Sequence, residues 1–312
     1  MADLDPQQHE PLPSAAEDAA RVREVPATPQ TVSPSYRLAF TDIPFLLREE
    51  LRPVRLQLEL LKPELELLER GIESTIVIFG SARILEPAVA RARREAAQAA
   101  ADAAPEDQRL AWAAELAQRL ERRSRSYEEA RRFAGLVSSA RRPDGQQRYV
   151  IVTGGGPGIM EAANRGAFEA GAISIGHNIV LPHEQAPNPY ITPELCFQFH
   201  YFALRKMHLM TRAKALVVCP GGFGTLDELF EILCLIQTGK SRPMPVLLFD
   251  EAYWRRVIDF GFLAEEGVVD ARDLRLFSFV ETAEQAWEHI QRYYAEADGE
   301  ADASGLDAAS PG

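Results

Sequence analysis

Short apolar runs alternate along most of the chain with longer segments of helical spacing. The runs are continuous, without regular polar positions, and this is typical of strands buried on both faces of a parallel sheet. They lie at residues 75–79, 149–153, 172–175, 216–219, 246–249 and 277–280. Because helical patterns separate them, we predict an α/β fold: a Rossmann-like, doubly wound parallel sheet with helices on both faces and an N-terminal helical extension.

Composition divides the chain into four parts. Those expected are a disordered N-terminal tail (1–34), a helical extension (35–70), the Rossmann-like domain (71–296, with a helical insertion at about 86–123) and a disordered acidic tail (297–312). The two tails have few large apolar side chains to offset the entropy cost of ordering. The leucine-rich extension is expected to be interrupted at Pro53 and Pro63.

Charge and composition exclude several classes of protein. The net charge is −12 and lysine is rare beside arginine, so we expect no nucleic-acid partner. No apolar run approaches the roughly 20 residues of a membrane span, and the polar N-terminus is unlike a signal peptide, so we expect no membrane partner and a cytoplasmic location. Three cysteines without a CxxC pair indicate neither a disulfide framework nor a zinc site, and Cys219 and Cys234 are expected to be buried thiols.

A glycine-rich turn follows the apolar run at 216–219. Its sequence, PGGFGT, places Gly221, Gly222 and Gly224 between the end of a strand and the start of a helix, with Thr225 offering a hydroxyl. The unpaired amides of a first helical turn favour an anion, and phosphate is the natural candidate. The acids that come next, Asp227 and Glu228, are expected in the first turn, where they would complement the helix dipole.

Two further loops are expected at the same edge of the sheet. Ser81 and Arg83 follow the first strand, and Gly154, Gly155 and Gly156 follow the second. The second loop fails the dinucleotide fingerprint, since the last glycine of GxGxxG would fall on Ile159, and no GxxxxGK[ST] occurs. We therefore expect no NAD, no Walker-type NTPase and no other cofactor.

The segment 177–200 is longer than a minimal connection and rich in proline, which is usual for a functional loop. Its histidines and the next one, at positions 177, 183, 200 and 208, lack metal-ligand spacing. We expect no metal, and imidazoles that face solvent or are hydrogen bonded.

Three motifs together resemble the LOG family, whose members are often mislabelled as lysine decarboxylases. They are PGGFGTLDE at 220–228, GGGPGIMEAANRGA at 154–167 and the adjacent pair Arg205 and Lys206. The resemblance covers about residues 74–295 and implies a hydrolase that cleaves the N-glycosidic bond of nucleoside 5′-monophosphates. AMP or a cytokinin ribotide would give free base and ribose 5-phosphate. Lysine decarboxylation has no support, since no SxHK motif for pyridoxal phosphate occurs.

The resemblance also implies roles for individual residues. Arg205 and Glu228 correspond to the catalytic pair. The implied substrate-binding residues are Gly221, Gly222, Phe223, Gly224, Thr225, Asp227, Lys206, Glu184, Gly154, Gly155, Gly156, Ser81 and Arg83. A longer loop between Glu184 and Arg205, and Cys234 where a hydroxyl residue is usual, depart from the family pattern and leave the base open.

A second interpretation is a non-catalytic carrier or sensor of a nucleotide or pterin cofactor on the same fold. Glycine loops suit both functions, whereas a pure binder has no need of the Arg205 and Glu228 pair. We also expect a homodimer or a higher even-numbered oligomer, because apolar helices at 44–70 extend a fold whose relatives place the site near a subunit contact.

Overall fold

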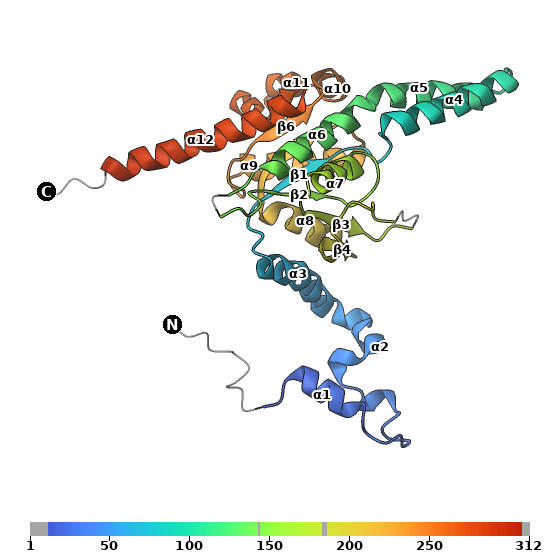
Figure 1. Cartoon of the computed structure of the whole chain (residues 1–312), viewed down its shortest axis with the longest axis vertical. Coiled ribbons are helices and arrows are strands. Elements are labelled where there is room, and N and C mark those ends of the chain that lie inside the picture. The colour runs from blue at the N-terminus through green and yellow to red at the C-terminus, as the bar shows by residue number, and fades with distance from the viewer. Residues whose placement is uncertain (1–11, 143, 183–185, 308–312) are drawn as a thin grey trace. The chain divides into compact units, whose positions relative to one another are not determined.

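The computed structural model describes the backbone of residues 12–142, 144–182 and 186–307, and side chains as far as Glu296 (Figure 1). The chain divides into two compact units, residues 1–61 and 62–312.

The first unit is built from short helices. They are α1 (Ala15–Val22), 3-10 turns at Pro34–Tyr36, Ala39–Thr41 and Glu49–Leu51, α2 (Ile43–Leu46) and the beginning of α3 (Arg52–Glu69). Helix α1 lies within the segment for which disorder was expected, and a capping box between Ser14 and Glu17 closes its first turn. No described residue before Lys62 is buried, so this unit has no apolar core of its own.

Helix α3 corrects the expectation that proline interrupts the extension. Pro53 occupies the first turn, where a missing N–H leaves no bond unmade, and Pro63 is a buried residue inside the helix. Only one intrahelical hydrogen bond is lost there, and burial of the ring favours the helix.

Seven parallel strands form the sheet of the second unit. They are β1 (Thr75–Phe79), β2 (Val150–Thr153), β3 (Ser174–Ile179), β4 (Cys196–Phe199), β5 (Ala213–Val218), β6 (Val246–Phe249) and β7 (Ser278–Val280). Their order is β4-β3-β2-β1-β5-β6-β7, and Ile76 of β1 pairs with Ile151 of β2 and Ala215 of β5. The direction of winding reverses at β1, where such sheets bind ligands. The predicted Rossmann-like fold is confirmed.

Two strands differ from the predicted positions. The run predicted to end at residue 175 continues through His177 to Ile179, and β4 lies in the segment expected to be a loop. The buried Asn178 is tolerated inside β3 because its side chain donates a hydrogen bond to the carbonyl of Phe197, at 3.3 Å. Strand β4 escaped prediction because it is a four-residue edge strand in which buried positions alternate with a partly exposed and an exposed one.

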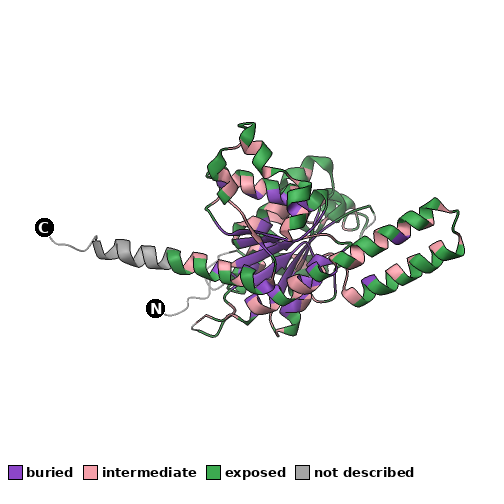
Figure 2. Cartoon of the chain, turned by 90° about the horizontal axis from the view of Figure 1, so that it is seen from above, coloured by how far each residue is buried: buried purple, intermediate pink, exposed green. Residues whose placement is uncertain are grey.

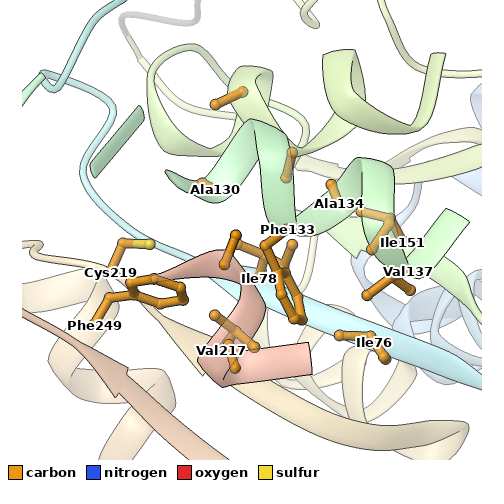
Figure 3. Close-up of a cluster of buried hydrophobic side chains, with 14 of the residues drawn as sticks. Ile76, Ile78, Ala130, Phe133, Ala134, Val137, Ile151, Val217, Cys219 and Phe249 are labelled. Atoms are coloured by element: carbon orange, nitrogen blue, oxygen red, sulfur yellow. The ribbon is translucent and has the colours of Figure 1, made fainter. Parts of the chain in front are cut away.

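Helices cover both faces of the sheet. Ile76 and Ile78 of β1 point to the face covered by α6 (Arg125–Ser139), α7 (Ile159–Glu169) and α12 (Ala283–Asp307), and Phe133 lies over them in Figure 3. The alternate residues Val77 and Phe79 point to the other face, covered by α8 (Phe202–Thr211), α9 (Phe223–Gln237) and α10 (Glu251–Val257). Each fully buried Ile or Phe contributes about 1.5–3 kcal/mol to folding.

The predicted insertion is a helical hairpin. Helices α4 (Pro87–Ala103) and α5 (Gln108–Arg123) run side by side away from the sheet (Figure 1), and Figure 2 shows them mostly exposed. Near the C-terminus, α11 (Phe260–Glu265), a 3-10 turn at Ala271–Arg275 and the continuation of α12 beyond its expected end at Ala295 were not predicted. No described helix is both long and apolar enough to span a bilayer.

Candidate functional site

Backbone hydrogen bonds join the loops that follow β1, β2 and β5. The amide of Ser81 donates to the carbonyl of Pro220 at 3.0 Å, and the amide of Ile159 donates to the carbonyl of Ser81 at 3.2 Å. Ser81 therefore lies between the two glycine loops at the carboxyl edge of the sheet. The structure brings together the three loops that the sequence placed at this edge.

The glycines of these loops are of two kinds. Gly158 has φ +70°, and a Cβ there would lie 2.5 Å from the carbonyl oxygen of Ser81; a Cβ at Gly221 would collide with the Thr225 side chain. Gly222 and Gly224 have no heavy atom within 4 Å of such a Cβ, and neither has a positive φ. The fold requires glycine in the first pair, whereas in the second pair open space lies beside the backbone.

Helix α9 begins at Phe223, directly after the glycine turn. Its N-cap is Gly222, and no side chain caps the first-turn amides, which remain available to a ligand. Asp227 and Glu228 consequently lie in the second turn, not the first, so the expectation that they complement the helix dipole was wrong. Thr225 is buried in the first turn.

Glu228 is a buried carboxyl group. Its exposed fraction is 6%, and burial raises its pKa to about 7, while the charges of Arg205 and Lys206 act in the opposite direction. Among the described residues, none forms an ion pair or hydrogen bond with this carboxylate. The pKa of this group therefore lies near neutral pH, and Arg205 acts on it through its charge, without a hydrogen bond or ion pair between the two side chains.

Arg205 is held from two sides. Its Nε donates to the carbonyl oxygen of His177 at 2.9 Å, and its guanidinium lies against Gly154, where a Cβ would be 2.6 Å from one terminal nitrogen. Burial lowers the pKa of Arg205, while Glu228 and Asp227 raise it. The guanidinium thus lies against the glycine loop after β2 and interacts electrostatically with Glu228.

Lys206 is engaged by carboxylates. Its Nζ lies 2.7 Å from Asp227 and 2.9 Å from Glu231, one turn further along α9. These ion pairs satisfy the charge that the family resemblance assigned to substrate binding.

The other predicted site residues have varied surroundings. Phe223 is 93% exposed at the start of α9, and Arg83 is exposed beside Ser81, whose hydroxyl accepts from the Arg83 amide. Gly155 and Gly156 accept hydrogen bonds from Asn188. Glu184 and His183 lie outside the described residues.

Asn188 and Tyr253 escaped the sequence-based prediction. The Asn188 carboxamide donates to the carbonyls of Gly155 and Gly156 at 3.1 and 3.0 Å, and the Tyr253 hydroxyl donates to the carbonyl of Gly221 at 2.6 Å. Asn188 lies in the long segment that was expected to be functional. Tyr253 lies on α10, where no sequence motif marks it.

An ion pair joins the helical hairpin to this region. Arg123, the last residue of α5, pairs with Asp250, and its guanidinium lies 5.0 Å from the centre of the Tyr253 ring. Asp250 is the one non-glycine residue of the described chain with positive φ, 69°, and its side chain accepts from the Tyr253 amide. Strain of this kind persists where several contacts fix the backbone.

Two expectations about titratable side chains were wrong. His177 is buried without a hydrogen-bond partner for either nitrogen, and burial lowers its pKa to about 3. The sequence could not show this, because His177 packs among aromatic rings from β4 and α8. Cys219 is buried as expected, whereas Cys234 is exposed. The described residues include no cluster of His, Cys, Asp and Glu suited to a metal ion.

Comparison with known proteins identifies relatives. Residues 160–290 match the family model described as possible lysine decarboxylase. A probable cytokinin riboside 5′-monophosphate phosphoribohydrolase of Oryza sativa subsp. japonica is 27% identical over 137 residues, 43% of this chain and 58% of that protein. A cytokinin riboside 5′-monophosphate phosphoribohydrolase of Arabidopsis thaliana is 28% identical over 177 residues, 55% of this chain and 77% of that protein.

A solved structure, the molybdenum cofactor carrier protein of Chlamydomonas reinhardtii, is 14% identical with a TM-score of 0.41. The alignment covers 72% of this chain and 99% of that one.

The residues aligned with the rice phosphoribohydrolase make up less than two thirds of that protein. The family match and the two phosphoribohydrolases confirm the resemblance to the LOG family. The residues that match the family model include Arg205, the glycine turn and Glu228.

Proposed function

We propose that this protein hydrolyses the N-glycosidic bond of nucleoside 5′-monophosphates, AMP or a cytokinin ribotide, to free base and ribose 5-phosphate. The observation that carries the proposal is a buried carboxyl, Glu228, with its pKa raised to about 7, beside an open glycine turn and the half-buried cation Arg205. Perturbed titratable groups of this kind cluster at functional sites.

The glycine turn suits the phosphate. Gly224 lies in the first turn of α9 without a positive φ, where alanine in place of glycine stabilises a protein by about 0.4–1 kcal/mol, and no described atom fills the space beside it. A ligand against the backbone explains why glycine is present there. Phosphate oxygens in that space would meet the uncapped amides of α9 and its positive dipole end.

Glu228 suits the sugar. Cleavage of a ribosyl bond develops positive charge on the ring, and a carboxylate stabilises that charge or orients the attacking water. In a buried site this electrostatic interaction is stronger than in water. Arg205 would neutralise the phosphate and place the ribose without a metal ion.

The test is incubation of the protein with a panel of nucleoside 5′-monophosphates, followed by chromatography for free base and ribose 5-phosphate. We expect base from AMP or a cytokinin ribotide, and roughly 100-fold less from the Glu228→Gln variant. Gln keeps the shape and hydrogen-bonding capacity of the side chain, so it isolates the charge.

If no panel member releases base while one binds tightly, the carrier interpretation replaces this proposal. If base is released equally by the Gln variant, the phosphate site stands but the role of Glu228 is wrong.

A further inference from the structure

A cavity lies at the opposite edge of the sheet from the glycine loops. Its volume is about 810 Å³, within the range of small-molecule sites. The first residues of β5, Ala213 and Lys214, and Met244, just before β6, line it, so it opens at the amino ends of these strands. The proposed catalytic residues Arg205 and Glu228 do not line it.

The cavity gathers most of the lysines of the chain. The sequence has four lysines, and Lys206, Lys214 and Lys240 line this one cavity together with Arg212 and Arg242. Two carboxylates, Glu73 and Glu231, line the cavity beside these five cations, and Asp227 and Glu64 pair with two of the cations from outside the lining. Five cations against these four carboxylates, in a chain of net charge −12, make the cavity locally cationic and favour an anion there.

Part of this charge is free of internal partners. Arg212 is bound by Glu64 at 2.6 and 2.7 Å, and Lys206 by Asp227 and Glu231. Across the described residues, by contrast, no carboxylate pairs with Lys214, Lys240 or Arg242, and all three are exposed. These three cations are available to a ligand.

The remaining lining is mostly apolar and is held by two hydrogen bonds. Tyr293 and Tyr294 of α12 donate hydrogen bonds to the carbonyls of Pro243 and Lys214, at 3.0 and 2.6 Å. These bonds fix α12 to the backbone beside Arg242 and at Lys214. Methionine side chains from α8 and the buried Met244 complete an apolar surface that can take the body of an organic ligand.

We propose that this cavity is a second binding site, which takes a small molecule bearing several phosphate groups. Lysine binds phosphate as a mobile point charge, and three free cations around one cavity match a chain of phosphates better than a single carboxylate. The cavity opens at the other edge of the sheet from the glycine loops, and among the described residues implied for substrate binding only Lys206, already paired with Asp227 and Glu231, lines it.

Titration calorimetry at low ionic strength tests the site with inorganic tripolyphosphate and, separately, with ATP. The Lys214→Gln, Lys240→Gln double variant should bind tripolyphosphate roughly tenfold more weakly or worse. The matched control is the Arg93→Gln, Arg256→Gln double variant, which removes the same charge from exposed positions outside the cavity. It should bind within about twofold of the unmodified protein. Tighter binding of ATP than of tripolyphosphate would show that the apolar lining contacts the organic part of the ligand. Equal binding would show that the site recognises the phosphate chain alone.

The Arg205→Ala variant separates this site from the glycine loops. Tripolyphosphate binding should survive that change, whatever its effect on turnover. Loss of binding in Arg205→Ala, or equal binding by the lysine variant and its control, would overturn the proposal. Because heat is measured without turnover, neither result depends on whether the chain cleaves nucleotides.

Discussion

Arg205 donates a hydrogen bond from Nε to the backbone carbonyl of His177, 2.9 Å away. This contact fixes the guanidinium of α8 to strand β3, so its terminal nitrogens are placed by the sheet. A cation positioned in this way is ready before the substrate arrives, which lowers the entropy cost of binding.

Arg205→Ala should raise KM for the nucleotide more than it lowers kcat, because the phosphate that this cation neutralises is present in the ground state. Arg205→Lys should recover only part of the loss, since one ammonium cannot both replace the Nε contact and face the ligand. Steady-state kinetics on AMP measure both. An unchanged KM in the alanine variant would remove Arg205 from phosphate binding.

The pKa of Glu228 predicts a pH dependence. If the carboxylate is the active form, kcat/KM should rise as the pH passes through about 7, and this rise should be absent in Glu228→Gln. A rate that is independent of pH from 5 to 9 would contradict the role of Glu228.

Stability should vary with pH in the opposite sense. The folded pKa of Glu228 lies above its ordinary value, so folding binds a proton, and the stability from this group is lost as the pH rises through 7. Glu228→Gln should therefore gain stability relative to the unmodified protein between pH 5 and pH 8, by up to about 3 kcal/mol. Urea unfolding of both proteins at pH 5 and at pH 8 measures their difference in stability. If that difference is the same at the two pH values, the carboxyl of Glu228 is not desolvated.

Two glycines should respond to alanine in opposite ways. Gly158→Ala should lower the melting temperature, because φ is +70° and the Ser81 carbonyl occupies the space that Cβ needs. Gly224→Ala should leave the fold unchanged or stabilise it by up to about 1 kcal/mol, and should weaken nucleotide binding. Melting curves and KM values distinguish these outcomes. A Gly224→Ala protein with normal KM would mean that no ligand lies there.

Tyr253→Phe removes the hydroxyl that holds the Gly221 carbonyl. Loss of this bond should cost about 0.5–1.5 kcal/mol of stability and raise KM, because the glycine turn becomes less ordered. Tyr293→Phe is the matched control, since its hydroxyl bonds the Pro243 carbonyl at the other edge of the sheet. The control should lose similar stability and keep its KM for AMP; equal KM values for both variants would contradict a positioning role for Tyr253.

Continuous apolar runs made the central strands predictable. The strand at 75–79 was placed without error because five consecutive buried residues leave little choice of structure. The edge strand β4 is short and half exposed, so its residues carry too weak a pattern to separate it from a loop. The glycine turn was predictable because, as in β1, neighbouring residues in the sequence determine the local structure.

Interactions across the fold were not predictable. Lys206 was assigned to the substrate by the family resemblance, whereas Glu231 reaches it from a different helix. The left-handed backbone of Asp250 and its pairing with Arg123 join residues more than 100 positions apart. Such contacts depend on the packing of finished elements, and a single sequence does not reveal them.

Arg123 lies at the end of the α4–α5 hairpin that joins the domain. Its pairing with Asp250 therefore does not depend on how long the hairpin is. The outer turns could be shortened or replaced by another sequence, for instance to carry a label or a tether, while the last turn of α5 kept its pairing with Asp250. The hairpin is therefore a position where a label or tether can be attached, and the residues that can be replaced end one turn before Arg123.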